Sequence, residues 1–351
     1  MEQWKEILQK SITTSQELHH QLGCDLNILQ DVIASFPMRI NPYFLNLIEY
    51  PGDPIWKQCV PDVLEIEDRV CIPDPLGEED LSPVPNLVHK YPNRVLLLAS
   101  NQCAMYCRFC TRKRKVGTSR MHISQWTLSL AYDYLRKHPE VSDVLISGGD
   151  PLLLDDELID DILGNLSKIR SIKMIRIGTR IPSVLPMRIT DRLCHILKKY
   201  HPLYINTHFN HPKELTAEAK EACSKLADAG IALGCQTVLL KGVNDNIDVL
   251  RELFQELLYM RVKPYYLFQS DLTKGVNHFR TSTSKGITLM KGLYGHLSGM
   301  AIPTFTLDAP GGKGKIPLTP QFVLENKDKT LIFKNYLGKT CTYPEAEDSD
   351  V

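Results

Sequence analysis

Three cysteines in the chain have a spacing that suits metal chemistry. Cys103, Cys107 and Cys110 form a C-x3-C-x2-C triplet, and clustered thiolates favour a soft metal centre. A structural zinc ion usually takes four protein ligands, and no fourth Cys or His follows at the usual spacing. Three cysteines can instead hold three irons of a cubane cluster and leave the fourth iron open to a small molecule.

Other interpretations of these cysteines remain as alternatives. They are a structural metal site, a set of unrelated core thiols, and a thioredoxin-like redox pair formed by Cys107 and Cys110. The presence of Cys103 and the lack of a thioredoxin-sized frame argue against the redox pair. We therefore favour an iron–sulfur cluster.

A glycine-rich loop at residues 309–317 carries Lys313 and Lys315. A lysine held on such a loop can form a Schiff base with an aldehyde. The loop lacks the G-x4-G-K-[ST] order of a Walker A loop, so we do not expect it to bind a nucleoside triphosphate. Asp308, directly before the loop, and Asp271 lie at the ends of two expected strands.

From residue 94 onward, short apolar runs alternate with amphipathic segments. This alternation predicts a parallel sheet with helices outside it. We expect strands at 94–100, 143–147, 173–178, 203–208, 231–239 and 262–268. We expect helices at about 124–138, 155–168, 189–200, 213–229, 245–260 and 284–297, and a further short strand at 302–308.

The number of strand–helix units predicts the architecture. Six units favour an α/β fold with a partial, TIM-like (β/α)6 barrel, because a complete (β/α)8 barrel usually needs roughly 250 residues. A doubly wound sheet is the alternative, and in both folds ligands bind at the C-terminal ends of the strands. The expected domains are an N-terminal helical cap and connector at 1–80, the barrel core at 81–298, and a C-terminal cofactor-binding segment at 299–351.

The composition argues against several classes of function. Lys plus Arg and Asp plus Glu number 41 each in 351 residues, so the net charge is zero and no global basic field indicates a nucleic-acid partner. The ten cysteines are scattered in a long chain that starts without a signal peptide, which argues against a secreted disulfide framework. No apolar run approaches the roughly 20 residues of a membrane helix. We expect a cytoplasmic protein without a membrane partner.

A short basic run at residues 112–115 leaves one alternative of a different class. A metal-stapled protein could present this run to nucleic acid. Short basic runs are usually solvated faces, so we expect no nucleic-acid partner.

The cysteine triplet resembles the cluster motif of radical S-adenosylmethionine enzymes. The resemblance implies a 4Fe-4S cluster on Cys103, Cys107 and Cys110 whose open iron binds S-adenosylmethionine. It also implies that the electron of the cluster cleaves this cofactor to a 5′-deoxyadenosyl radical.

Further residues at strand ends match the cofactor-binding pattern of the same enzymes. Gly148, Gly149 and Asp150 resemble the element that meets the methionyl group of S-adenosylmethionine. Two successive glycines let the backbone approach a ligand closely and expose its amides. His208 and Gln236 match residues that lie near the adenosyl group.

Several segments resemble the lysine 2,3-aminomutase family, which combines this radical chemistry with pyridoxal phosphate. Within about residues 40–340 they are 94–114, 147–151, 208–212, 236–245, 264–280 and 308–317. The resemblance implies that Lys315 binds pyridoxal phosphate, with Lys313 a rival by chemistry only, and that Tyr91 and Arg94 lie near the phosphate. Lys90 stands where the family has arginine. Lysine keeps the positive charge but lacks the planar guanidinium that binds an anion through two hydrogen bonds.

The same resemblance implies the substrate contacts and the reaction. Arg112 would bind the substrate carboxylate, and Asp271 and Asp308 would hold the ε-ammonium of lysine and reject a glutamate side chain. We expect an isomerase that interconverts L-lysine and β-lysine by radical 1,2-amino migration. The alternative is the same isomerisation serving the modification of elongation factor P.

The resemblance also bears on partners. Asn246 stands where zinc-binding members of the family have cysteine, and the tail holds only Cys341. We therefore expect no structural zinc and no zinc-tied tetramer, although we expect a homo-oligomer. The radical chemistry implies an electron donor such as flavodoxin or ferredoxin.

Overall fold

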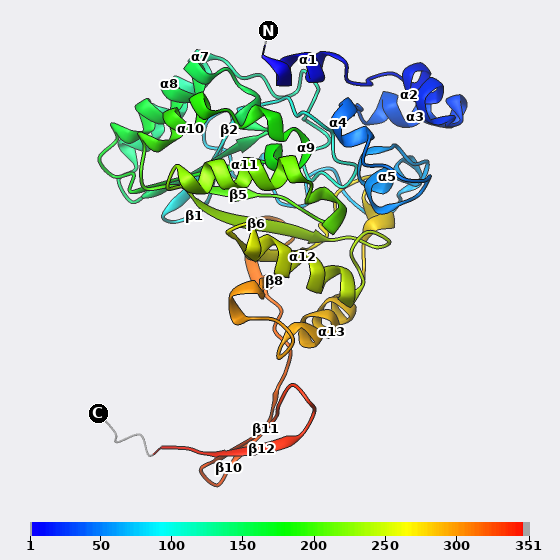
Figure 1. The fold of residues 1–351 in the computed structure, drawn as a ribbon. Helices are drawn as coiled ribbons and strands as arrows, with labels where there is room; N and C mark the ends of the chain where they lie inside the picture. Colours follow the sequence, from blue (N-terminus) through cyan, green and yellow to red (C-terminus); the bar gives the residue numbers. More distant parts are fainter. Residues whose placement is uncertain (1, 347–351) are drawn as a thin grey trace.

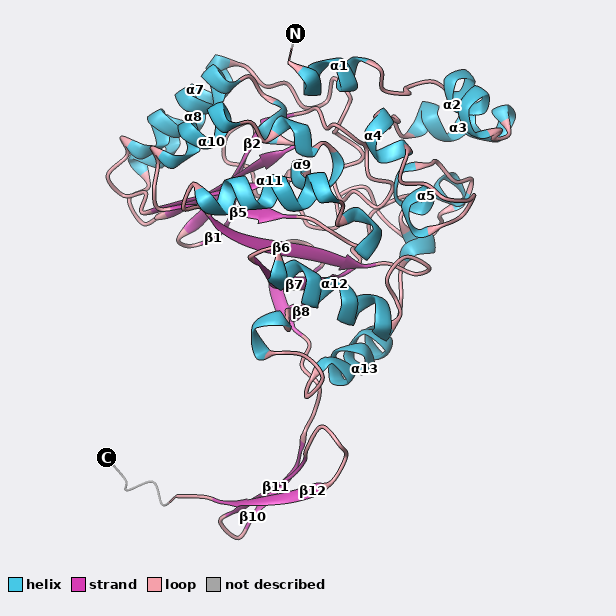
Figure 2. Ribbon diagram, viewed as in Figure 1, coloured by secondary structure: helices cyan, strands magenta, loops and turns pink. Residues whose placement is uncertain are grey.

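The centre of the computed structural model is a nine-stranded sheet whose strands lie in chain order (Figure 2). The structure describes residues 2–346, apart from the side chains of residues 27 and 28. The strands are β1 (Leu87–Tyr91), β2 (Arg94–Ser100), β3 (Asp143–Gly148), β4 (Met174–Gly178), β5 (Leu203–Thr207), β6 (Ala232–Leu239), β7 (Val262–Gln269), β8 (Thr304–Ala309) and β9 (Gly314–Pro317). Strands β2–β8 run parallel, whereas β1 and β9 pair antiparallel with their neighbours at the two edges.

Each of the strands β2–β7 is followed by a helix outside the sheet (Figure 1). These helices are α7 (Gln125–Lys137), α8 (Asp156–Ser167), α10 (Asp191–Lys198), α11 (Ala217–Asp228), α12 (Ile247–Tyr259) and α13 (Thr283–Leu293), with the short helix α9 (Ile181–Val184) before α10. The six units confirm the predicted partial (β/α)6 barrel. The doubly wound alternative is wrong, because its strand order would reverse at a switch point and the observed order does not.

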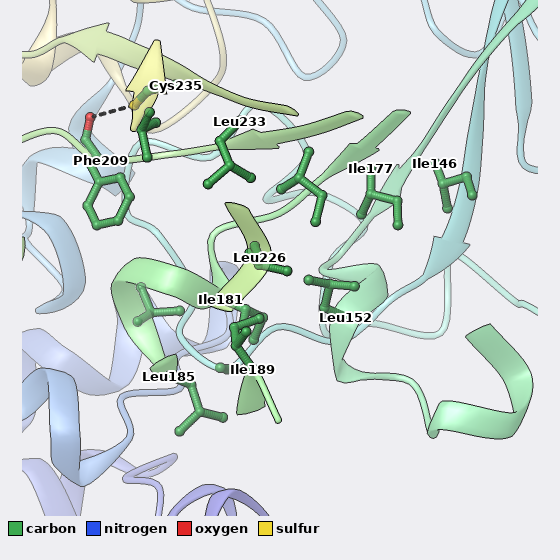
Figure 3. Packing of buried hydrophobic residues seen from close by; sticks show 14 of the residues in the cluster. Ile146, Leu152, Ile177, Ile181, Leu185, Ile189, Phe209, Leu226, Leu233 and Cys235 are labelled. Carbon is green, nitrogen blue, oxygen red and sulfur yellow. Dashed lines mark hydrogen bonds between the residues drawn. The ribbon is translucent and has the colours of Figure 1, made fainter. Parts of the chain in front are cut away.

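The parallel strands present different residues to their two faces. In β6, Leu233 and Cys235 are buried on the helix side, while Gln236 and Val238 are half-buried and line an interior cavity. Figure 3 shows Leu233 together with side chains from β3 and β4, all pointing toward the helical layer. The apolar core therefore lies between the sheet and the helices, which leaves the interior of the barrel for a ligand.

Six helices precede the barrel and lie along one side of it (Figure 1, blue). They are α1 (Gln3–Gln9), α2 (Ser15–Leu22), α3 (Leu26–Ser35), α4 (Pro42–Leu45), α5 (Pro54–Cys59) and α6 (Leu64–Glu67). The side chains of Thr14, Asn41 and Asp53 accept backbone N–H bonds at the starts of α2, α4 and α5, as good N-cap residues do. Buried residues of this N-terminal extension, such as Trp4 and Leu18, join the main core.

A buried ionic cluster anchors the cysteine loop to this extension. Glu65 accepts hydrogen bonds from Arg108 Nε at 2.9 Å and Nη2 at 2.6 Å, and from Lys113 Nζ at 2.7 Å. Removing one member of such a pair typically costs about 3–5 kcal/mol, because the other charge stays buried without a partner. The cysteine loop is therefore held from outside the barrel as well as from within.

The C-terminal strands form a separate small sheet. The antiparallel strands β10 (Val323–Lys327), β11 (Thr330–Lys334) and β12 (Thr340–Pro344) pair in that order. Figure 1 shows this sheet (red) standing away from the barrel. Within residues 2–346, no helix combines the length and the apolar character that a bilayer crossing requires.

Candidate active site

A cavity of about 550 Å³ opens inside the barrel at the C-terminal ends of the parallel strands. All the site residues predicted from the sequence line it. They are Tyr91, Arg94, Cys103, Cys107, Cys110, Arg112, Gly148, Gly149, Asp150, His208, Gln236, Asp271, Asp308 and Lys315. The rival Lys313 is not among the lining residues. The fold thus brings together residues that are more than 200 positions apart in the chain.

The three thiols stand in one wall of this cavity. Among the described residues, no group of three His, Cys, Asp or Glu side chains is arranged to hold a single metal ion. A cubane cluster makes a different demand, because each cysteine binds its own iron and the thiols stand around the cluster. Arg180 Nη1 donates to Cys107 Sγ at 2.9 Å, and the Arg112 amide donates to Cys110 Sγ at 3.3 Å. The donor set and its N–H bonds fit an iron–sulfur cluster.

Burial keeps two of these thiols protonated in the protein alone. It raises the pKa of Cys110 to about 11, and it raises the pKa of Cys103 well above its ordinary value. Metal coordination removes such a proton outright. Cluster assembly therefore releases protons, as thiolate metal sites generally do.

The glycine turn after β3 packs directly against the cysteine loop. The Gly149 amide donates to Ser100 O at 2.5 Å, and the Asp150 amide donates to Gln102 O at 2.7 Å. A Cβ on Gly148 would lie 2.3 Å from Ser100 O, and one on Gly149 would lie 2.3 Å from Gln102 O. The expectation that these glycines expose their amides to a ligand is therefore wrong for Gly149, whose amide binds the cysteine loop instead.

The Asp150 carboxylate also points into the protein. It accepts hydrogen bonds from Thr179 Oγ1 and from the amide of Arg180, both at 2.7 Å, and from the amide of Leu152 at 3.1 Å. Burial raises the pKa of this carboxyl above its usual value. Asp150 thus ties the end of β3 to the loop after β4.

Arg180 is a site residue that sequence reasoning missed. Its Nη2 donates to Gln58 Oε1 at 2.6 Å and to Glu214 Oε2 at 3.0 Å, while its Nη1 reaches Cys107. A hydrogen bond to a cluster thiolate tunes the reduction potential of an iron–sulfur centre. The only local signal was a charged residue just after a strand end, at the edge where ligands bind.

His208 is neutral in this environment. Burial and the nearby Arg180 cation lower its pKa to about 3, and its Nε2 lies 3.0 Å from Asn210 Oδ1. A neutral ring that lines the cavity can contact a ligand without adding charge. Gln236 lines the same space from the inward face of β6.

Lys315 lies at the seam between the two edges of the sheet. It pairs with Asp308 in the β8–β9 ladder, and its Nζ lies 2.8 Å from Asp308 Oδ2. From the other edge, Lys90 Nζ reaches Asp308 Oδ1 at 3.1 Å, and the Tyr91 hydroxyl accepts the Lys315 amide at 3.1 Å. Gly311 and Gly312 in the connecting turn have φ of +72°, which glycine adopts without strain.

Two charged groups beside Lys315 have no partner of opposite charge in the described part of the chain. The Arg94 guanidinium stacks on the Tyr91 ring at 4.3 Å but makes no ion pair with residues 2–346. Asp271 likewise has no ion pair there, and burial together with Asp308 raises its pKa to about 7. An unpaired cation suits a phosphate, and an unpaired acid suits an ammonium group.

The basic run at 112–115 is neutralised from within. Arg112 binds Glu78, Arg114 binds Asp74 at 3.0 Å, and Lys115 lies 3.3 Å from Glu79. Acids of the connector before β1 therefore match this run, which leaves little free charge for nucleic acid.

The chain is similar to known proteins over most of its length. The family model of the radical SAM superfamily matches residues 97–254, and the lysine-2,3-aminomutase model matches residues 290–350. An L-lysine 2,3-aminomutase of Fusobacterium nucleatum is 50% identical over 319 residues, which cover 90% of this chain and 75% of the relative. The chain belongs to the lysine 2,3-aminomutase family.

Other members of the family extend this match. The L-lysine 2,3-aminomutase of Methanococcus maripaludis is 50% identical over 354 residues, covering 98% of this chain and 82% of the relative. A glutamate 2,3-aminomutase of Clostridioides difficile is 44% identical over 325 residues, covering 92% of this chain and 77% of the relative. As a radical SAM family member, the enzyme uses S-adenosylmethionine and a 4Fe-4S cluster.

The substitution Gly149→Ala tests the packing of the cysteine loop. Its Cβ would lie 2.3 Å from Gln102 O and 2.7 Å from Gln102 N, so the turn and the loop must separate. We expect iron bound per chain after anaerobic reconstitution to fall by at least about half, because a site must be held within about 0.5 Å of its working geometry. The control is Gly299→Ala, where nothing lies within 4 Å of the added Cβ. Full iron retention in Gly149→Ala would contradict this account.

Proposed function

We propose that this enzyme interconverts L-lysine and β-lysine by radical migration of the amino group. The observation that carries the proposal is the acidic pair Asp271 and Asp308 in the wall of the cavity that also holds Lys315. Asp308 already binds Lys90 and Lys315, whereas the buried Asp271 has no ion pair within residues 2–346. An arriving ammonium group would therefore stabilise the ionised Asp271 carboxylate. The ε-ammonium of lysine supplies that group.

The acidic pair also bears on the choice between lysine and glutamate. A lysine 2,3-aminomutase is 50% identical to this chain and a glutamate 2,3-aminomutase is 44% identical, so similarity alone leaves both substrates open. A glutamate side chain beside Asp271 and Asp308 would place like charges together in a poorly solvated site. The chemistry of the pair therefore supports lysine.

We further propose pyridoxal phosphate as the second cofactor, bound to Lys315. When bound there, it would supply an aldehyde for the substrate amine and a ring able to delocalise an unpaired electron. The supporting residues are Arg94, whose guanidinium lies free of carboxylates on Tyr91, and Lys90, which reaches the same corner. Arg94 and Tyr91 would hold the phosphate, and Asp308 Oδ2, 2.8 Å from Lys315 Nζ, positions the lysine for the cofactor.

The remaining roles are assigned along the cavity wall. Cys103, Cys107 and Cys110 would bind the cluster, and the substrate carboxylate would bind Arg112. The residues proposed to contact S-adenosylmethionine are Gly148, Gly149, His208 and Gln236. Because the Asp150 carboxylate is engaged by protein groups, its part is to shape the turn.

We propose a flavodoxin or ferredoxin as the electron donor and the reducing cytoplasm as the compartment, because the cluster needs both. A second candidate function is formation of β-lysine for attachment to elongation factor P. It uses the same site and differs in the hand of the product, so a chiral assay separates the two.

We also propose that the protein is a homo-oligomer. The sheet β10–β12 stands apart from the barrel (Figure 1), and Val323, Leu324 and Tyr343 on it are exposed by 43%, 52% and 61%. Large exposed apolar patches often mark protein–protein contacts, so we expect a second copy of the chain to cover these side chains. Sedimentation equilibrium should give a mass of at least two chains, and a monomer at micromolar concentration would contradict this.

The first test is an anaerobic assay with L-lysine. Reconstituted enzyme with S-adenosylmethionine, pyridoxal phosphate and a reductant should form β-lysine, which chiral chromatography detects. L-Glutamate should give no product above background. The control Lys315→Ala should lose the product and the cofactor absorbance while it keeps its iron. Cleavage of S-adenosylmethionine without β-lysine would contradict the proposed substrate.

The pKa of Asp271 predicts a pH dependence. This carboxyl has a pKa of about 7, so most of it is protonated at pH 6 and ionised at pH 8. Only the ionised form attracts the ε-ammonium, so the KM for L-lysine should fall roughly tenfold over this range, as one titrating group predicts. In Asp271→Asn the KM should be higher and flat with pH in this window. A KM in the wild type that is flat from pH 6 to 8 would contradict the role of Asp271.

A further inference from the structure

The connector between the N-terminal extension and β1 places an acid against the proposed carboxylate-binding arginine. Glu78 is buried, with its side chain 7% exposed. Arg112 Nε donates to both Glu78 oxygens at 3.0 Å, and Arg112 Nη2 donates to Oε1 at 2.6 Å. The arginine is thus already engaged by an anion of the protein.

These bonds occupy only one edge of the guanidinium group. An arginine side chain offers a side edge, made of Nε and Nη2, and an end edge, made of Nη1 and Nη2. Glu78 takes the side edge, and Nη1 of Arg112 has no hydrogen-bond partner among residues 2–346. The end edge is therefore left for a second carboxylate, and Arg112 and Glu78 both line the cavity.

We propose that Glu78 is a positioning residue that sets the specificity of this site for an amino acid with a free carboxylate. It holds the side edge of Arg112 so that the end edge meets the substrate carboxylate. The inference rests on the proposed function, since it assumes lysine as the substrate and Arg112 as its carboxylate contact.

The connector also fixes where this carboxylate contact lies relative to the other end of the substrate. Ile72 exchanges backbone hydrogen bonds with the loop after Asp271, through Leu272 O at 2.9 Å and the Lys274 amide at 2.8 Å. Pro75 O accepts the Gly311 amide at 2.8 Å, in the turn that leads to Lys315. One short segment therefore ties together the groups proposed to bind the carboxylate, the ε-ammonium and the cofactor.

This arrangement has a consequence for selectivity. The span between Arg112 and Asp271 is set by a connector that is hydrogen-bonded at several points, rather than by two independent flexible loops. A substrate must match that span with its carboxylate and its ammonium group. Glu78 supplies the contact at the carboxylate end, because it is the only acid bound to the Arg112 guanidinium in the described part of the chain.

The test is a kinetic comparison of Glu78→Gln with the matched control Glu79→Gln in the reconstituted holoenzyme. Glu79 is the adjacent acid, 58% exposed, and it pairs with Arg114 and Lys115 instead. In Glu78→Gln the KM for L-lysine should rise about tenfold while kcat stays within about twofold, because the charge-assisted contacts that orient the arginine weaken. Glu79→Gln should leave both constants unchanged.

Two further measurements show whether Glu78 acts through Arg112. The inhibition constant of 1,5-diaminopentane, which has no carboxylate, should be the same in the wild type and in Glu78→Gln. In an Arg112→Lys background, Glu78→Gln should change the KM little, since the guanidinium that Glu78 orients is already absent. If Glu78→Gln is poorly folded, Glu78→Asp, which keeps the charge but withdraws it, should show a smaller rise in KM.

The outcomes separate this inference from the proposed function. Failure of the wild type to form β-lysine contradicts the proposed function itself. β-Lysine formation by the wild type with an unchanged KM in both Glu78 variants overturns only the role of Glu78. An equal KM effect in the Arg112→Lys background would also overturn it, since Glu78 would then act elsewhere.

Discussion

The close contact between two stretches of backbone is the constraint on which the rest of this site depends. The turn at Gly148 and Gly149 lies so near residues 100–102 that no side chain fits between them. Hydrogen bonds from Gly149 and Asp150 then hold the start of the cysteine loop. A loop alone would be a poor platform for three metal ligands, because loops are the most mobile part of a fold. Here the loop takes its position from the end of a central strand.

Buried charge explains why the barrel needs the segments that precede it. Three arginines near the cysteines are each met by an acid from elsewhere: Arg108 by Glu65, Arg112 by Glu78, and Arg180 by Glu214. Buried pairs add little net stability, but a buried charge without its partner is costly. Glu65 and Glu78 both precede β1, so the N-terminal extension and the connector supply the negative charges that pair with Arg108 and Arg112.

The sequence predicted those features that depend on residues close together in the chain. The cysteine triplet, the alternation of strands and helices, and the glycine turn each depend on residues a few positions apart. The environment of Arg180 could not be predicted, since its partners Gln58 and Glu214 are 122 and 34 positions away. The glycine turn was found but the role of the Gly149 amide was misassigned, because the close approach that the turn permits is to another loop. Strand β10 gave no signal, since all of its residues are exposed and no alternation marks it.

The two antiparallel edge strands have a consequence for how the barrel holds together. The ladder of backbone hydrogen bonds stops at β1 and β9, and the gap between these edges is bridged by side chains of Lys90 and Tyr91 that reach Asp308 and Lys315. The barrel is thus a split ring whose ends meet at the very lysine proposed to carry a cofactor. A ligand that contacted both edges would add contacts across this split and would stabilise the closed ring in proportion to its binding.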